Sequence, residues 1–150
     1  MPAQSVCVPI SILSDSAIMP TRGSAEAAGY DLYADLDHPV QIAPHTTEMI
    51  PTGIAIAVPS GYFGAVYARS GLSTKQGLRP ANAVGVVDSD YTGQVFVALH
   101  NDSEITRTVQ GGDRIAQLVI QPYVAADFSV VDTLEQTERG SGGFGSTGSN

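Results

Sequence analysis

The chain has 150 residues and a formal net charge of −8 at pH 7, from 7 Lys and Arg against 15 Asp and Glu. This length suits one domain with a hydrophobic core. The acidic balance argues against non-specific binding to nucleic acid or membrane surfaces, so we expect neither as a partner. The single cysteine, Cys7, cannot form an intramolecular disulfide, and no apolar run approaches the roughly 18 residues of a membrane span. The first thirteen residues lack the basic and apolar regions of a secretory signal, so we expect a cytoplasmic protein.

Alternating apolar residues predict a succession of short strands. The first covers residues 6–12, where Pro9 favours the edge of a sheet. Ser70–Gln76 is the stretch that fits a helix, with Ser70 as its N-cap and Gly77 closing it. The other expected strands cover residues 30–34, 40–42, 47–50, 54–58, 61–68, 94–100, 105–109, 114–121 and 128–131.

These elements predict the fold class. About a dozen short strands with turn signals every 8–12 residues are typical of a β-sandwich or jelly roll. We therefore expect an all-β, jelly-roll-like sandwich with one short helix. Residues 1–138 would form this β domain, and the Gly- and Ser-rich residues 139–150 would form a mobile C-terminal arm.

A polar turn follows an apolar run within residues 82–93. A strand that ends at Asp88 would present this carboxylate and Tyr91 together at the mouth of a pocket. The stretch also matches the start of a calcium-binding loop, but Leu99 stands at the twelfth position, where that loop needs a bidentate Glu. A plain polar hairpin turn stays open as an interpretation of this stretch alone.

Two further stretches suit phosphate. Arg69, Ser70 and Gly71 offer a guanidinium, a hydroxyl and a bare backbone amide at the start of the expected helix, where free N–H groups attract anions. A plain N-cap beside a surface arginine fits these residues equally well. Gln117 lies on an otherwise apolar strand, where a neutral amide could donate to a phosphate without the cost of burying a charge. A solvent-facing polar residue is the alternative.

The tail resembles a flexible linker, yet it carries Arg139, Phe144 and Thr147 at intervals, which linkers do not usually do. A mobile arm of this kind could close over a bound nucleotide and exclude water. The three histidines are scattered and form no ligand pair at metal spacing, so we expect no metal bound directly by protein side chains.

Five stretches, in this order, resemble the five motifs of the trimeric dUTP pyrophosphatases (dUTPases), and they span nearly the whole chain. The resemblance implies a homotrimer that hydrolyses dUTP to dUMP and diphosphate, which keeps dUTP low and supplies dUMP for dTMP synthesis. Mg²⁺ would be held by the dUTP phosphates and water. Each active site would be shared: one chain gives the first, second and fourth motifs, another the third, and another the arm. The stretches are residues 25–34, 68–72, 82–93, 112–118 and 139–148.

The resemblance also implies residue roles. Asp88 would be the general base that takes a proton from the attacking water, with Asp90 as a less essential rival. Asp31 would support the site through an ion pair to an arginine such as Arg69, although a solvated carboxylate at a strand end is the alternative. Substrate contacts would come from Arg69, Ser70, Gly71 and Gln117 for the phosphates, from Asn82, Gly85, Val86 and Val87 for uracil, from Tyr91 for deoxyribose, from Phe96 for a further contact, and from Arg139, Phe144, Ser146 and Thr147 in the closed arm.

Two other functions stay open at this point. The related dCTP deaminase shares the fold and would prefer cytosine in the hairpin slot, whereas the hairpin and the tail of this chain favour uracil. A nucleotide-sensing module, in which a dUTP-dependent arm regulates a protein partner, would be indicated by a partner-specific insertion, which we do not see in the sequence.

Overall fold

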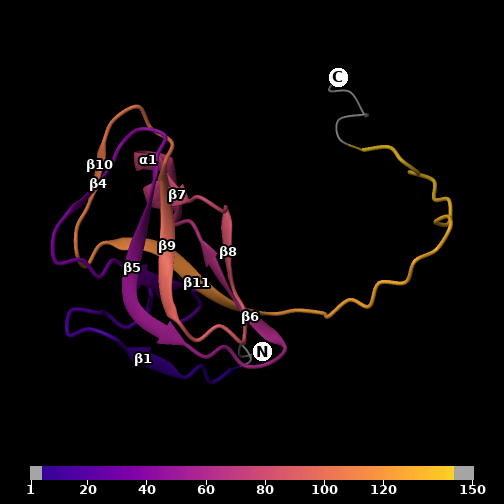
Figure 1. Ribbon diagram of the computed structural model, residues 1–150, viewed down its shortest axis with the longest axis horizontal. Coiled ribbons are helices and arrows are strands. Elements are labelled where there is room, and N and C mark those ends of the chain that lie inside the picture. The colour runs from indigo at the N-terminus through magenta and orange to yellow at the C-terminus, as the bar shows by residue number, and fades with distance from the viewer. Residues whose placement is uncertain (1–4, 144–150) are drawn as a thin grey trace.

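The computed structural model describes residues 5–143, which form eleven strands and one short helix (Figure 1). The helix α1 (Ser70–Gln76) lies between β6 and β7. The strands are β1 (Ile10–Ile12), β2 (Thr21–Arg22), β3 (Tyr30–Tyr33), β4 (Val40–Ile42), β5 (Thr47–Ile56), β6 (Tyr62–Tyr67), β7 (Leu78–Pro80), β8 (Val84–Val87), β9 (Gln94–Asn101), β10 (Arg107–Val109) and β11 (Arg114–Pro122).

The strands form two main antiparallel sheets and one small one. The four-stranded sheet has the order β1-β5-β9-β7, the five-stranded sheet has the order β2-β3-β11-β6-β8, and β4 pairs with β10. This arrangement confirms the expected all-β sandwich with one short helix. In the five-stranded sheet, β8 is an edge strand with one side unpaired, and β3 brings polar residues beside β11.

The core lies between the inner faces of the sheets. On β9, Val95, Val97 and Leu99 are at most 2% exposed, while Phe96 and His100 alternate with them on the outer face, as the period of a strand requires. Burying an aliphatic side chain of this size contributes about 1.5–3 kcal/mol.

The N- and C-terminal limits of several strands differ from the sequence expectation. The stretches 47–50 and 54–58 belong to one long strand, β5, which continues through a register shift between Pro51 and Ala55. The first strand begins at Ile10 because Pro9 has no amide to donate, although its carbonyl still accepts from Ala57 N at 2.9 Å. The short strands β2 and β7 were not expected, since two or three residues are too few for a periodic signal.

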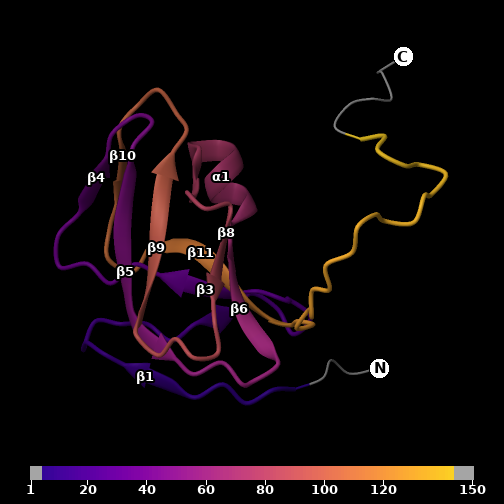
Figure 2. The same cartoon turned by 45° about the vertical axis from the view of Figure 1, so that its right-hand side comes forward.

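The strand expected at residues 128–131 is wrong. After β11 the chain leaves the sandwich and extends away from it (Figures 1 and 2). Phe128 and Val130 are 92% and 99% exposed. A strand needs a neighbour for its N–H and C=O groups, and alternation of apolar residues along the sequence does not say whether one exists.

The N-cap of the helix lies one residue earlier than expected. Arg69 is the N-cap, in extended conformation (φ −88°, ψ 130°) and without a capping side-chain hydrogen bond, so Ser70 is the first helical residue and the expectation that it caps the helix is wrong. Arg69 continues the extended chain that leaves β6, and this moves the cap position. Gly77 closes the helix as expected, with the left-handed φ of 69° that glycine tolerates best. Among the described residues, α1 is the one helix, and it is too short to cross a membrane.

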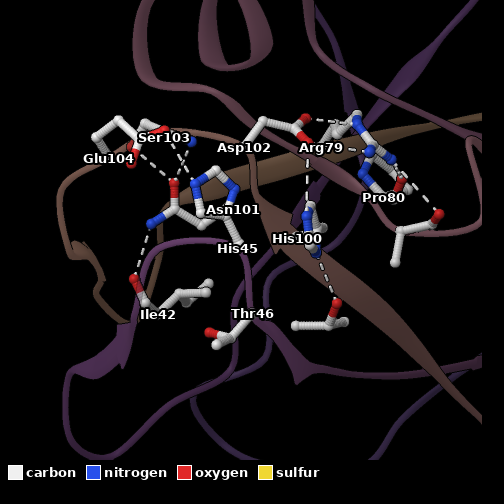
Figure 3. Close-up of polar contacts among 12 residues, drawn as sticks. Ile42, His45, Thr46, Arg79, Pro80, His100, Asn101, Asp102, Ser103 and Glu104 are labelled. Atoms are coloured by element: carbon white, nitrogen blue, oxygen red, sulfur yellow. Dashed lines mark hydrogen bonds and ion pairs between the residues drawn. The ribbon is translucent and has the colours of Figure 1, made fainter.

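A buried amide ties the ends of β9, β4 and the following loop (Figure 3). Asn101 is fully buried; its Nδ2 donates to the carbonyls of Ile42 (2.9 Å) and Ile105 (2.8 Å), and its Oδ1 accepts from Ser103 N (2.9 Å) and Ser103 Oγ (2.7 Å). A buried amide whose donors and acceptor are all paired fixes the loop without an unsatisfied polar group.

Candidate active site

A pocket of about 300 Å³ lies beside the β8 hairpin. The outward-facing Met49 of β5 and Ala98 of β9 also line it. All seven residues that the sequence assigned to the hairpin site reach this pocket: Asn82, Gly85, Val86, Val87, Asp88, Tyr91 and Phe96.

The turn before β8 is tightly bent. Ala83 has a positive φ of 60°, and Val84 N donates to Asn82 O at 2.6 Å across it, the pattern of a γ-turn. A side chain in this region costs about 1–2 kcal/mol, and such strain concentrates at functional sites. Because β8 is the last strand of its sheet, its outer edge is free to hydrogen-bond a flat, polar ligand.

Beyond β8, a turn places the carboxylate and the aromatic ring at the pocket. Tyr91 N donates to Asp88 O at 3.1 Å, and Tyr91 Oη donates to Gln94 O at 2.7 Å. The ring lies over Gly93, where an added Cβ would come within 2.7 Å of Tyr91 Oη. Glycine at this position therefore lets the tyrosine fold back over its own turn, at the rim of the pocket, beside the exposed Asp88.

A second group of polar residues lies on the outer face of the five-stranded sheet. Asp31 on β3 stands directly opposite Gln117 on β11. Arg69 Nε donates to Asp31 Oδ1 at 2.7 Å, with the two side chains 26% and 16% exposed. The ion pair expected between Asp31 and an arginine is present, and it is better shielded from water than a surface pair, which is typically worth little.

Gln117 is held more firmly than expected. Its Nε2 donates to Ala68 O at 2.9 Å, directly before Arg69, and its Oε1 lies so close to Gly29 that an added Cβ there would be 2.2 Å away. An amide nitrogen carries two hydrogens, so one stays available to a ligand. The glutamine thus fixes the junction of β6 and α1 while it keeps one donor.

Of the predicted arm residues, Arg139 lies within the described part of the chain. Arg139 Nε donates to Gly142 O at 2.7 Å, within its own turn. Phe144, Ser146 and Thr147 lie outside the described residues.

The hairpin pocket and the arginine group are separate within one chain. A second cavity, of about 400 Å³, is lined by Arg69 and Arg114 among others, and the two cavities share no lining residue. β3 and β8 are three strand spacings apart, or about 14 Å. Within residues 5–143, three or more His, Cys, Asp or Glu side chains nowhere gather as a metal site would require.

Comparison with known proteins identifies the family. A family model described as dUTPase matches residues 15–148. The chain belongs to the dUTPase family. The deoxyuridine 5'-triphosphate nucleotidohydrolase of Desulfitobacterium hafniense (strain DSM 10664 / DCB-2) is 49% identical over 131 residues, 87% of each chain. The protein of the same name from Saccharomyces cerevisiae is 47% identical over 140 residues, 93% of this chain and 92% of the relative.

Solved dUTPase structures share the fold. A mutant dUTPase of Staphylococcus bacteriophage 80alpha, solved with dUpNHpp, superposes with a TM-score of 0.87 at 29% identity, covering 97% of this chain and 100% of that chain. The dUTPase of phage phi11 of S. aureus gives a TM-score of 0.77 at 27% identity, over 88% of this chain and all of the other.

Two residues that lie beside the candidate site residues were not predicted from the sequence. Met49 is 60% exposed and lines the hairpin pocket from a strand more than thirty residues earlier, so no local pattern links it to the hairpin. Arg114 lies 3.6 Å from Asp31 Oδ2 through its Nη1, at a strand position that regular alternation would turn to the other face.

Proposed function

We propose that this chain hydrolyses dUTP to dUMP and diphosphate, with Asp88 as the general base. The observation that carries the proposal is the gathering of all seven hairpin residues, Asp88 included, at one pocket. The names of its relatives and the dUTP analogue in the phage 80alpha dUTPase support dUTP as the substrate.

The chemistry needs one proton acceptor and a held triphosphate. Asp88 accepts a proton from a water molecule whose oxygen attacks the α-phosphorus. The bond from that phosphorus to the α–β bridging oxygen breaks, and diphosphate leaves with the bond's electron pair. A positioned base of this kind typically contributes ~10²–10⁴-fold to the rate. Arg69, Ser70, Gly71 and the remaining Gln117 donor bind the phosphates.

The pocket selects the base and the sugar. Asn82 and the free edge of β8 at Gly85, Val86 and Val87 offer both donors and acceptors to the edge of uracil, and a hydrogen-bonding slot of this kind rejects a base with the opposite pattern. Tyr91 packs on deoxyribose and leaves no space for a 2′-hydroxyl, and Phe96 adds a contact from β9. This pattern favours dUTP hydrolysis over the deamination of dCTP.

Mg²⁺ belongs to the proposal as a companion of the substrate. Hard oxygen ligands on a triphosphate suit it, and it usually keeps several waters. The side chains fit this role, because the hairpin pocket and the group around Asp31 and Arg69 each present few carboxylates and form no closed cage for an ion. Bound in this way, the ion neutralises charge on the phosphate oxygens, while the side chains orient the triphosphate.

A homotrimer with shared sites would join the two separated groups. The chain past β11 exposes a run of apolar side chains that a lone subunit leaves in water: Val124, Phe128, Val130 and Leu134 are each at least 86% exposed. Contact with neighbouring copies would bury them. Residues 1–138 would then be the β domain and 139–150 the arm, which brings Arg139, Phe144, Ser146 and Thr147 over the nucleotide of another subunit. The enzyme would act in the cytoplasm, keeping dUTP low and supplying dUMP.

The test is diphosphate release from dUTP with Mg²⁺, in parallel with dCTP, dTTP and UTP, for the native chain and Asp88→Asn. The variant keeps the shape of the side chain and removes its basicity. We expect turnover of dUTP alone, reduced at least ~10²-fold in the variant. Ammonia from dCTP would assign a deaminase instead, and tight dUTP binding without turnover would replace the enzyme by a nucleotide sensor.

A further inference from the structure

The chain between β7 and β8 forms the turn that places Asn82, the residue proposed to read the edge of uracil. β7 has three residues and lies at the edge of its sheet, beside β9. It ends at Pro80, which has no N–H to donate to its neighbour. Ala81 N then donates to Ala98 O at 2.7 Å. Ala83 N donates to Pro80 O at 3.1 Å, and this bond closes the turn. The position of Asn82 therefore depends on how firmly these two carbonyl-bearing residues, 80 and 81, are held.

The side chain of Arg79 binds this segment (Figure 3). Its Nη1 donates to the carbonyl oxygen of Pro80 at 3.1 Å and lies 3.4 Å from that of Ala81, which accepts a longer bond. A carbonyl oxygen has two lone pairs, so the Pro80 carbonyl accepts from the guanidinium and from Ala83 N together. Hydrogen bonds from a cationic donor are stronger than neutral ones. The guanidinium thus holds two successive carbonyls of the chain directly before Asn82.

Asp102 fixes the guanidinium from the other side. Arg79 Nε donates to Asp102 Oδ2 at 2.6 Å, and Nη2 donates to Oδ1 at 3.1 Å. This bidentate contact sets the plane of the fork. Asp102 is itself anchored, because its N–H donates to Gly77 O at 2.8 Å and it follows the fully buried Asn101. The two side chains are 37% and 45% exposed, so the pair adds little to stability, and its effect is on geometry.

The other charged groups of this region have partners of their own. His100 Nε2 lies 3.5 Å from Asp102 Oδ1, and its Nδ1 shares a hydrogen bond with Thr47 Oγ1 at 2.9 Å. Glu104, in the same loop as Asp102, lies 3.0 Å from His45 Nε2. Asp102 is therefore the carboxylate that faces the fork of the arginine.

The held segment leads directly into the hairpin pocket, which Pro80 and Asn82 both line. Asn82 Nδ2 would lie 3.4 Å from a Cβ added at Gly85, so the amide packs against β8, the strand that would read the base. Val84 N donates to Asn82 O at 2.6 Å. A shift of the turn would move the amide relative to β8, and a misplacement of about 1 Å can cost ~10²-fold in activity.

We propose that Arg79 is a positioning residue for uracil recognition. Held by Asp102, its guanidinium fixes the two carbonyls before Asn82 and so the place of the Asn82 amide. This inference rests on the proposed function, because it assigns the residue to the reading of uracil in dUTP. Uracil lies away from the phosphorus that reacts, so loss of this positioning weakens the binding of substrate and transition state alike. Such a loss raises KM and leaves kcat nearly unchanged.

The experiment compares Arg79→Gln with the native protein in dUTP turnover with Mg²⁺ and in calorimetry with dUpNHpp and inorganic diphosphate. Glutamine cannot bridge a carboxylate and two carbonyls. We expect KM for dUTP to rise and affinity for dUpNHpp to fall, each roughly 10-fold, because charge-assisted hydrogen bonds are lost. The kcat and the affinity for diphosphate, which has no base, should stay within about 2-fold. Hydrogen exchange of the Ala83 N–H should be roughly 10-fold faster, because the turn opens more readily.

Arg107→Gln is the matched control. Arg107 Nε donates to Ser103 Oγ at 3.2 Å, so this variant also removes a guanidinium bound to the loop that carries Asp102. It should leave KM and both affinities within about 2-fold, as most substitutions away from a site do. Arg79→Lys keeps the charge beside Asp102 without the planar fork, so an intermediate rise in KM is expected. The lysine variant also serves if Arg79→Gln fails to fold.

Four results would each overturn the proposal: an unchanged KM in Arg79→Gln, a loss of kcat without a change in KM, an equal loss of affinity for diphosphate, or an equal loss in Arg107→Gln. Faster exchange at Ala83 with full affinity for dUpNHpp would also overturn it, because Arg79 would then stabilise the turn alone. If the native protein turns over no dUTP, the proposed function fails instead, and the dUpNHpp comparison with the exchange of Ala83 still decides on Arg79.

Discussion

At the scale of single residues, the hairpin pocket depends on backbone positions that few side chains tolerate. Ala83 holds a positive φ in the turn before β8, and Gly93 leaves room for Tyr91 to fold over its own turn. Gly29 does the same for Gln117. At these two glycines, a side chain would collide with Tyr91 or with Gln117.

A titratable group away from the site allows a test of the surface electrostatics. The pKa of Asp102 is lowered from its ordinary 3.8, first because Arg79 donates hydrogen bonds to the carboxylate, and then through the charges of Arg79, His100 and His45. Arg79 Nε lies 2.6 Å from Asp102 Oδ2, and His100 Nε2 lies 3.5 Å from Oδ1 (Figure 3). Since the folded pKa is the lower one, the ionised carboxylate stabilises the fold above the unfolded pKa. This contribution is lost as the pH falls through the folded value, below 3.8.

An NMR titration of the Asp102 carboxyl carbon should give a midpoint below 3.8. Arg79→Gln removes the main cause, so the midpoint should rise toward the ordinary value, while Lys75→Gln should leave it in place. A midpoint that Arg79→Gln does not move would contradict the assignment of the shift to Arg79.

At the scale of elements, the glycines at the two ends of α1 have different reasons to be glycine. Gly77 has a φ of 69°, and an added Cβ would come 3.2 Å from Ser103 Cβ. Gly71, inside the first turn, has no atom within 4 Å of an added Cβ. The fold of one chain therefore requires glycine at position 77 and not at position 71, which points to the ligand as the reason for Gly71.

The two alanine substitutions should separate stability from activity. Gly77→Ala should lower the free energy of unfolding by about 1 kcal/mol or more, the cost of a left-handed alanine. Gly71→Ala should raise it by about 0.5 kcal/mol through better helix propensity. The same Gly71→Ala should lower kcat/KM for dUTP by roughly 10-fold, because its Cβ would separate the backbone amide from the phosphate. Chemical denaturation measures the free energy of unfolding, and steady-state kinetics measure kcat/KM. Full activity in Gly71→Ala would show that the phosphates do not approach this backbone.

The elements also show what can be learned from the sequence. The hairpin was predictable because its seven residues lie within a short stretch and one turn brings them together. The Asp31–Arg69 ion pair was expected by resemblance to the family. The contact of Arg114 with Asp31 was not predicted. The register of β11 shifts between Arg114 and Ala116, and the alternation of apolar residues in the sequence does not show this shift. The prediction of a strand at residues 128–131 is wrong for the opposite reason. The apolar residues there do alternate, but among the described residues no other strand pairs with them.

At the scale of the whole molecule, we propose that the active site is made between chains. Asp88 lines the hairpin pocket, whereas Arg69, the N-cap of α1, lines the second cavity, and the two cavities share no lining residue. Exposed apolar residues past β11 offer surface for neighbouring copies. If the sites are shared, two inactive variants that are defective in different groups should complement each other.

The most direct measurement is therefore dUTP turnover by mixed assemblies of Asp88→Asn and Arg69→Gln chains, co-expressed in equal amounts. Each variant alone should be nearly inactive. Over all randomly assembled trimers, a site that takes Arg69 from one chain and Asp88 from another is intact in about one quarter of cases, the product of two independent one-in-two choices in a closed symmetric ring. Recovery of about a quarter of native activity is the predicted result. Activity that stays at the level of the separate variants would mean that both residues act within one chain, and would contradict the shared site.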